Sequence, residues 1–316
     1  MTIQRSHESN SSNTQTTNKN TIALFGEVLA DVFPDRSVLG GAPYNVARHL
    51  QVFGQHPVLV SRVGNDALRD ELLAEMTRLG MDGSGMQFDV NHPTGQVIVD
   101  IDENGHHFEI LPDQAYDHIH AGVTHLITMK IQPNMVYFGT LAQRSLASRL
   151  ALDVFLSETK SPRFLDLNLR KPWYDKHIIR RSLLRADVVK VNEEELLLVA
   201  DLLKLSGTPG RGHGLGLIEK FNLDYLLVTC GADGAWMLAK DGTETHATGQ
   251  KPHGDLVDTV GAGDGFSAIC MLGLLANWPA ELMLARANAF AAALCGIRGA
   301  VPDNLDFYRP FFEDNT

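Results

Sequence analysis

The sequence predicts an α/β protein in which a mostly parallel sheet carries helices on both of its faces. Three observations support this fold class: short apolar segments alternate with helix-like segments, one hairpin-like stretch interrupts the alternation, and polar residues follow several apolar segments. The chain has 316 residues, of which 44% are hydrophobic, so it can bury the core of one such domain.

The N-terminal part predicts two strand–helix units. The apolar run 22–25 suits a buried strand, and the helical spacing that follows predicts a helix ending at Gly54. Residues 58–60 predict the next strand. Asp66 can cap a second helix, which Gly80 would close.

The stretch TGQVIVDIDENGHHFEIL (94–111) alternates apolar and polar residues on both sides of a Glu-Asn-Gly turn. This pattern predicts a β-hairpin with one buried face. Because the hairpin interrupts the strand–helix series, we expect it to belong to a small sheet outside the main one.

The strand–helix alternation then returns. Strands are predicted over 135–138, 164–168, 188–191, 225–229 and 235–239, and helices over 146–156, 178–184, 193–203, 263–276 and 279–296, with Pro279 at the first position of the last helix. Residues 206–216 hold five glycines and a proline, and they predict a loop.

Composition and charge exclude several classes of function. The net charge of −11 implies no broad basic surface, which argues against nucleic acid as a partner. No apolar run approaches the roughly 20 residues of a membrane span. Residues 1–20 are polar, predict a disordered leader and lack the apolar region of a signal peptide. The three cysteines in apolar surroundings suggest buried thiols, and we expect a cytoplasmic protein.

Polar residues and glycines stand where several predicted strands end. They are Asp31, Asp166, Asn168, Arg170, Asn192 and Glu195, together with Gly231 and Gly234, which follow Thr229. Because ligands of open parallel sheets gather at the carboxyl ends of strands, these residues indicate one shared cleft. Asp166, Asn168 and Arg170 would lie on one side of an extended segment, which favours contact of Arg170 with phosphate or substrate.

The segment DTVGAGDGFSA (258–268) combines small residues, a carboxylate and the start of an apolar helix. Gly261, Ala262 and Gly263 let backbone N–H groups converge at the positive end of the helix dipole, where phosphate oxygens are favoured. Asp264 falls in the first turn, where the dipole should stabilise its ionised form and make it a weak base. A weak base suffices to orient an alcohol for phosphoryl transfer.

These motifs resemble those of a known family. DTVGAGDGFSA is similar to the C-terminal signature of ribokinase-like (PfkB) sugar kinases, and LGGAPYNVARHLQVFG with SRVGNDALRDELLAEM is similar to their N-terminal signature. The resemblance runs from about residue 22 to 312 in the family's order. Within the family, GEVLADVFPD, GGAPYNVA, HPTGQVIVD and DLNLRKPWY most resemble bacterial fructokinases.

The resemblance implies a three-layer αβα core over residues 21–316, with a small β-sheet lid that includes about 92–112. It implies a sugar kinase that uses ATP and Mg²⁺, with K⁺ as a further candidate ion. It also implies Asp264 as the catalytic base and residues 261–263 as the anion hole. The other matched positions are Asp31, Gly41 and Asn45 for sugar hydroxyls, Asn192 and Glu195 for magnesium and phosphate, Thr229, Gly231 and Gly234 for the nucleotide, and Asp258, Val260 and Gly299 for a monovalent-cation loop.

The resemblance favours fructose as the acceptor, and several alternatives stay open. Ribokinases proper carry a lysine in the Gly-Gly motif that is absent here, and residues 92–118 hold no Lys or Arg, which weighs against a sugar phosphate. The acceptor could instead be 2-keto-3-deoxygluconate or a nucleoside, or the chain could be a non-catalytic sugar-binding regulator. The glycine spacing disfavours a nicotinamide-dependent oxidoreductase. An exposed lid sheet makes a homodimer through the lid plausible.

Overall fold

The structure of the chain is a computed structural model that describes residues 19–102, 105–252 and 254–312. The polar leader predicted over 1–20 lies outside the described residues except for its last two. The Glu103–Asn104 turn of the predicted hairpin also lies outside them.

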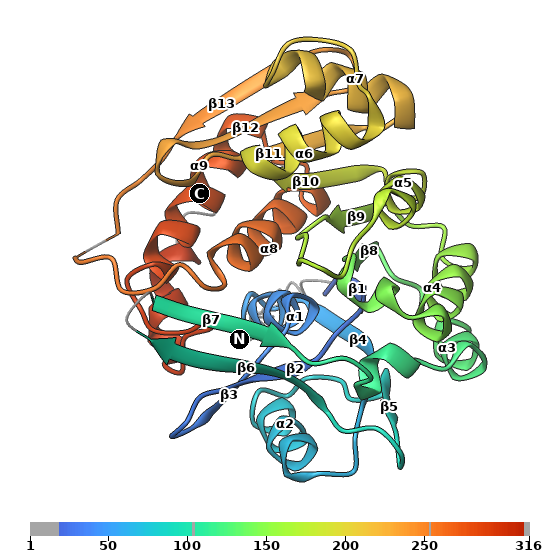
Figure 1. Cartoon of the computed structure of the whole chain (residues 1–316). Helices are drawn as coiled ribbons and strands as arrows, with labels where there is room; N and C mark the ends of the chain where they lie inside the picture. The colour runs from blue at the N-terminus through green and yellow to red at the C-terminus, as the bar shows by residue number, and fades with distance from the viewer. Residues whose placement is uncertain (1–18, 103–104, 253, 313–316) are drawn as a thin grey trace, which may run out of the picture.

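A large sheet forms the centre of the described structure (Figure 1). Its nine strands within the described ranges stand in the order β13 (Glu244–Thr248), β12 (Gly234–Ala239), β11 (Tyr225–Thr229), β10 (Val188–Asn192), β9 (Arg163–Asp166), β8 (Met135–Phe138), β1 (Thr21–Phe25), β4 (His56–Val63) and β5 (Met86–Phe88). β12 pairs antiparallel with both neighbours, and the other pairs are parallel. The predicted, mostly parallel sheet is therefore confirmed.

A smaller sheet lies beside the large one (Figure 1). Its strands, in spatial order, are β3 (Ser37–Gly40), β2 (Leu29–Val32), β6 (Gly95–Asp102) and β7 (Gly105–Ile110). The antiparallel pairing of β6 with β7 confirms the predicted hairpin and its place outside the main sheet. The sequence analysis did not predict the β2–β3 pair, and this pair places Asp31 within the small sheet, opposite Val38 and Val97, rather than at the edge of the large one.

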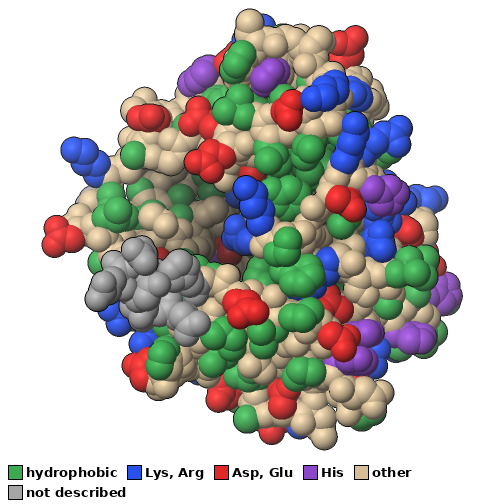
Figure 2. All heavy atoms as spheres, in the orientation of Figure 1, with side chains coloured by type: hydrophobic (Ala, Val, Ile, Leu, Met, Phe, Trp, Pro, Cys, Tyr) green, Lys and Arg blue, Asp and Glu red, His purple; other side chains and the backbone are tan. Residues whose placement is uncertain are grey.

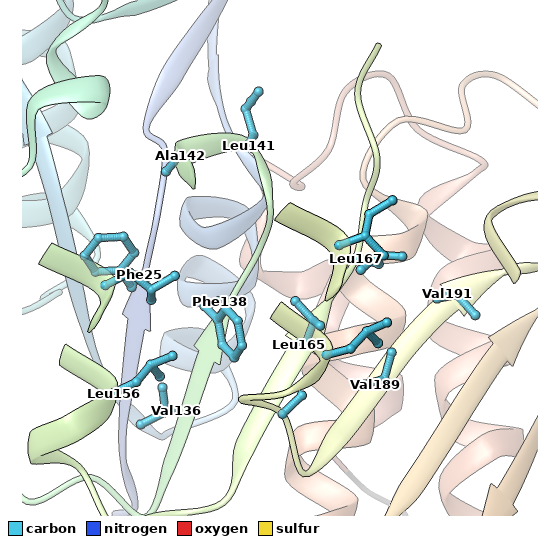
Figure 3. Packing of buried hydrophobic residues seen from close by; sticks show 14 of the residues in the cluster. Phe25, Val136, Phe138, Leu141, Ala142, Leu156, Leu165, Leu167, Val189 and Val191 are labelled. Carbon is cyan, nitrogen blue, oxygen red and sulfur yellow. The ribbon is translucent and has the colours of Figure 1, made fainter. Parts of the chain in front are cut away.

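The helices form a layer on each face of the large sheet. One layer holds α1 (Ala42–Val52), α2 (Ala67–Arg78), α8 (Ala262–Leu275) and α9 (Ala280–Leu294), and the other holds α3 (Ala121–Thr128), α4 (Leu146–Glu158), α5 (Lys176–Leu183), α6 (Glu193–Leu203) and α7 (Arg211–Phe221). Successive strand residues point to opposite faces, so Leu24 packs with the first layer and Phe25 with the second. Figure 3 shows Phe25 and Phe138, from the neighbouring strands β1 and β8, in the apolar cluster between the large sheet and this second layer.

Three expectations about individual elements are wrong. The predicted loop 206–216 becomes helical from residue 211, because Gly214 lets α7 approach the sheet; a Cβ there would lie 3.2 Å from Leu226 and Trp236. The strand predicted over 164–168 ends at Asp166, because Asn168 has a left-handed φ of 39° that breaks an extended segment. Pro279 is the cap residue before α9 rather than its first residue.

The topology positions a cleft at one edge of the large sheet. β1 lies between β8 and β4, so the chain builds outward from β1 in both directions, and ligands bind at such switch points. Figure 2 shows this side of the molecule hollowed, with basic side chains gathered at the edge of the hollow. In the described part of the chain, no helix is long and apolar enough to cross a membrane.

Candidate functional site

The first turn of α8 forms the centre of the candidate site. Its cap residue, Gly261, has a left-handed φ of 80°, and an added Cβ would lie 2.3 Å from the Cα of Ala300. The amide of Ala262 donates to the Thr259 carbonyl at 3.3 Å, whereas the amides of Gly263 and Asp264 have no acceptor among the described residues. Gly263 of the predicted anion hole and the adjacent Asp264 therefore offer the amides best placed for an anion.

The Asp264 side chain is buried at the start of α8, with 8% of the residue exposed. Its Oδ2 accepts a hydrogen bond from the side-chain amide of Asn45 at 2.8 Å. Burial raises the pKa of Asp264 to about 6, against the opposing effects of Asn45, Lys190 and Arg170. The expectation of a weak base is therefore wrong, because loss of solvent outweighs the favourable helix terminus.

A buried cation lies directly behind the α8 turn. Lys190 of β10 contacts both carboxylate oxygens of Asp166 at 3.1–3.2 Å, and Ser267 of α8 donates to Asp166 at 2.8 Å. A Cβ added to Gly263 would lie 3.0 Å from the Lys190 amine. The ion pair with Asp166 keeps the pKa of Lys190 raised despite burial, so the amine stays charged beside the turn.

The positive charge of Arg170 acts on three carboxyl groups near the candidate site. Burial raises the pKa of Asp264, Asp31 and Glu27, and the guanidinium of Arg170 lowers the pKa of all three. Arg170 therefore lies near all three carboxylates, and its contact with phosphate or substrate stays a prediction. Its neighbour Asn168 is half-buried, but the two residues do not share one side of an extended segment, because the chain turns between them and β9.

Three of the predicted sugar-binding residues come from the small sheet and from the start of α1. Asp31 stands on β2 of the small sheet, where burial raises its pKa to about 6 and Arg170 opposes the rise. Gly41 precedes α1, and an added Cβ there would lie 2.7 Å from the Glu27 carbonyl. Asn45 lies inside α1 and does not cap it, so its amide is available for the bond to Asp264.

Glu27 was missed by the sequence analysis. Its side chain follows β1, only 5% of the residue is exposed, and Oε2 has no hydrogen-bond partner within the described ranges of the chain. Burial raises the pKa of Glu27 to about 7, and the nearby charge of Asp264 adds to the rise. An acidic residue just after a buried strand was the available sequence signal, because acids are rarely fully buried without a partner.

Asn192 and Glu195 form a capping box at the start of α6. The Asn192 side chain accepts from the Glu195 amide at 2.8 Å, and Glu195 Oε2 accepts from the Asn192 amide at 2.9 Å. Glu195 Oε1 accepts from the Leu169 amide at 2.7 Å. Burial raises the pKa of Glu195, with Lys190 opposing the rise. The pair thus joins α6 to the segment that carries Asn168 and Arg170.

The remaining predicted residues lie at two turns. Thr229 ends β11, and Gly231 and Gly234 bound the short 3₁₀ turn that leads into β12. On the other side, Asp258 accepts from the amides of Val260 at 3.0 Å and Gly299 at 3.2 Å. The three residues predicted for the cation loop are therefore brought together. Burial raises the pKa of Asp31 most, Arg170 lowers it, and the negative charge of Asp258 raises it further. The Asp258 loop therefore lies near the small sheet, which carries Asp31.

This arrangement can support transfer of an anionic group to an alcohol. A buried carboxylate is positioned to accept a proton, two backbone amides beside it have no acceptor among the described residues, and a paired lysine lies behind them. Donors fixed before reaction stabilise developing negative charge without reorganising.

Comparisons with known proteins agree with this geometry. The sequence model of the pfkB family carbohydrate kinases matches residues 15–306. The fructokinase of Vibrio alginolyticus is 26% identical over 313 residues, which cover 92% of this chain and 98% of the relative.

Two solved structures share the fold. A fructokinase double mutant of Vibrio cholerae O395, in a form with bound fructose, ADP and potassium, has a TM-score of 0.74 at 22% identity, covering 92% of this chain and 97% of that one. An uncharacterized sugar kinase of Pyrococcus horikoshii in complex with ATP has a TM-score of 0.72 at 25% identity, covering 88% and 93% of the two chains.

Proposed function

This chain belongs to the pfkB family of carbohydrate kinases, and we propose that it transfers the γ-phosphoryl group of ATP to a primary hydroxyl of a sugar, with fructose favoured. One observation carries the proposal: the buried carboxylate of Asp264 lies beside backbone amides that have no acceptor among the described residues. The names of the fructokinase relatives support fructose as the acceptor, and the ATP-bound sugar kinase supports ATP as the donor.

Asp264 orients the acceptor and takes its proton. The Asn45 amide holds Oδ2, which leaves Oδ1 for the sugar hydroxyl. With a pKa of about 6, the carboxylate is mostly ionised at neutral pH and remains a useful base. The hydroxyl oxygen bonds to the γ-phosphorus, the bond from that phosphorus to the β–γ bridging oxygen breaks, and ADP leaves. The hydroxyl proton passes to Asp264.

The amides of Gly263 and Asp264 bind the phosphoryl oxygens as charge redistributes over them. They act together with the partial positive charge at the start of α8. The Lys190 amine lies close behind this turn and adds positive potential, while its ion pair with Asp166 holds it in place. Gly261 and Ala262 shape the turn that presents these donors.

The acceptor sugar lies between the small sheet and α1. Asp31 approaches it from the small sheet and Arg170 from the segment after β9, and their attraction favours closure of the small sheet over the cleft. Gly41 permits close approach beside Glu27, and Asn45 and Asn168 supply amide groups for hydroxyls. Closure excludes water, which would compete with the sugar as acceptor.

ATP is assigned to the turn between β11 and β12, which carries Thr229, Gly231 and Gly234. Asn192 and Glu195 fit a role toward Mg²⁺ because each Glu195 oxygen accepts one amide hydrogen from the described residues and keeps a lone pair for a metal-bound water. Bound Mg²⁺ would neutralise charge on the phosphates. Both residues already make hydrogen bonds that hold the start of α6, so they fit contact with Mg²⁺ through its bound water better than direct ligation.

K⁺ is assigned to the loop of Asp258, Val260 and Gly299. The Asp258 carboxylate is occupied by two amides, so it shapes the loop, and backbone carbonyls are left as ligands. An exposed Val260 side chain is compatible with this role, because the residue would contribute only its backbone.

A panel of sugars tests the function directly. We expect ADP release with ATP, Mg²⁺ and fructose, faster than with ribose, a nucleoside or 2-keto-3-deoxygluconate, and stimulated by K⁺. Saturable fructose binding without turnover of any acceptor would favour a sugar-binding regulator. Preference for another acceptor would retain the kinase and overturn fructose. The homodimer through the lid and the cytoplasmic location stay predictions.

A further inference from the structure

A cluster of two histidines and an aspartate lies at the base of the small sheet's hairpin. His92 stands in the segment that leads into β6, and Asp113 and His118 stand in the segment that leaves β7. One side-chain ligand atom from each lies within 4.8 Å of the others. The Asp113 carboxylate is 2.8 Å from His118 Nε2 and 3.7 Å from His92 Nε2.

A buried carboxylate orients His92 toward this cluster. His92 Nδ1 lies 3.1 Å from Oδ2 of Asp89, whose side chain is only 1% exposed. Asp89 is held in turn by Arg62 at 2.9 Å, so it is fixed as an acceptor. When Nδ1 of His92 donates to Asp89, Nε2 carries the lone pair, and this nitrogen lies on the side of Asp113.

The backbone also holds the other two residues in place. Asp113 adopts a left-handed φ of 56°, which turns the chain directly after the hairpin. His118 ends the 3₁₀ turn η1 (Ala115–His118), and its carbonyl accepts from Arg62 at 2.6 Å. Arg62 thus contacts both the Asp89 support and the His118 backbone, and it ties the two segments together.

We propose that His92, Asp113 and His118 bind a divalent transition metal ion of the zinc type. Two imidazole nitrogens and one carboxylate oxygen are a common protein ligand set for such ions, with water in the remaining position. The Asp89–His92 contact matches the second carboxylate that usually supports a metal-bound histidine. No step of the proposed kinase reaction uses these residues.

Binding requires one local rearrangement. The two imidazole rings are stacked, with centroids 3.6 Å apart and planes 14° apart, so their ring nitrogens do not converge on one point, and His118 Nε2 must give up the proton of its contact with Asp113. Asp89 holds the His92 ring, whereas the His118 side chain is 31% exposed and borders a surface pocket. The His118 ring therefore turns to complete the site. Because the ligands come from both segments that carry the hairpin, a bound ion would join its entry and exit.

The test is metal binding by the full chain after treatment with a chelator. We titrate Co²⁺, follow its visible absorption, and then displace it with Zn²⁺. We expect one equivalent to bind in the wild type. His92→Ala and His118→Ala should each weaken binding by more than about 100-fold, and Asp89→Asn by about 10- to 100-fold. His177→Ala, at an exposed histidine of α5, is the matched control and should bind as the wild type does.

Thermal unfolding gives a second readout that does not depend on kinase activity. Zn²⁺ should raise the unfolding temperature of the wild type and of His177→Ala, but not of His92→Ala or His118→Ala. The metal-free proteins show whether each variant is folded. Equal Co²⁺ affinity in the wild type and His118→Ala, or no stoichiometric binding in the wild type, would overturn the proposal.

Discussion

The side-chain amide of Asn45 donates a 2.8 Å hydrogen bond to Oδ2 of Asp264, although the two residues are 219 positions apart in the sequence. The bond joins α1 to the first turn of α8. It fixes one carboxylate oxygen and leaves the other for the acceptor hydroxyl of the proposed reaction. The geometry of the proposed base therefore depends on a neighbour from the opposite end of the chain.

Replacing Asp264 with Asn should remove the proton acceptor while preserving shape. We expect kcat to fall by about 10²- to 10⁴-fold, with ATP affinity nearly unchanged. The exposed Asp70, an acid in the first turn of α2, provides a control, and Asp70→Asn should retain near-native turnover. Steady-state kinetics and nucleotide titration measure both effects. Near-native turnover of Asp264→Asn would show that this carboxylate is not the base.

Replacing Asn45 with Ala should shift the pH dependence of catalysis. Only ionised Asp264 accepts the proton, so kcat/KM should rise as pH passes through about 6 and then level off. The Asn45 hydrogen bond lowers the pKa of Asp264, so its removal should move this acidic limb upward by about one pH unit. Asn65→Ala, at an exposed position, should leave the limb in place. An unmoved limb in Asn45→Ala would contradict the coupling.

Glu27→Gln should stabilise the protein at alkaline pH. Burial raises the pKa of Glu27 from 4.5 to about 7, so the folded state binds more protons than the unfolded state between these values. Wild-type stability should therefore fall as pH rises through this window, by about 3 kcal/mol for this group.

Urea unfolding at several pH values measures this effect. Glu27→Gln should be more stable than the wild type at pH 8, and the difference should shrink toward pH 4.5. Glu71→Gln, at an exposed site on α2, should show no such pH-dependent difference. Parallel curves for the wild type and Glu27→Gln would argue against a strained carboxylate at this position.

Gly261→Ala should lower activity more than the cost of a left-handed φ alone would predict. Gly261 and Gly242 have similar left-handed φ values of 80° and 87°, but only the Cβ at 261 meets other atoms, 2.3 Å from the Ala300 Cα. Both alanines carry a left-handed cost of about 1–2 kcal/mol. Only Gly261→Ala must displace the start of α8, which should lower kcat on the order of 10²-fold. Equal activity of the two variants would refute this distinction.

The sequence predicted elements best where one pattern dominated. The apolar strand at 22–25, the Asp66 cap and the hairpin at 95–110 were all expected, because periodicity or capping chemistry marks them locally. The helix α7 was missed because its glycines signal a loop, and packing against Trp236 and Leu238 overrides that signal. β2 and β3 were missed because their four-residue lengths give too little alternation to recognise.

The candidate site was predicted only where its residues are neighbours in the sequence. Asp264 and the glycines beside it form a continuous motif, so their proximity follows from the chain itself. Glu27 and the ion pair of Lys190 with Asp166 depend on burial and on strand neighbours, which a single sequence does not reveal. Environment also reversed the expected basicity of Asp264, because the sequence shows a helix terminus but not the exclusion of water around it.

The long separation between α1 and α8 has a consequence during protein synthesis. Leu50 and Val46 of α1 lie in one apolar cluster with Phe266 and Phe290, which the ribosome adds more than two hundred residues later. Until those helices emerge, the early half of the chain presents an uncovered apolar surface and lacks Asp264, the proposed base. Chains that stop before residue 262 should therefore be inactive and prone to aggregate, which makes completion of translation the moment at which activity first becomes available.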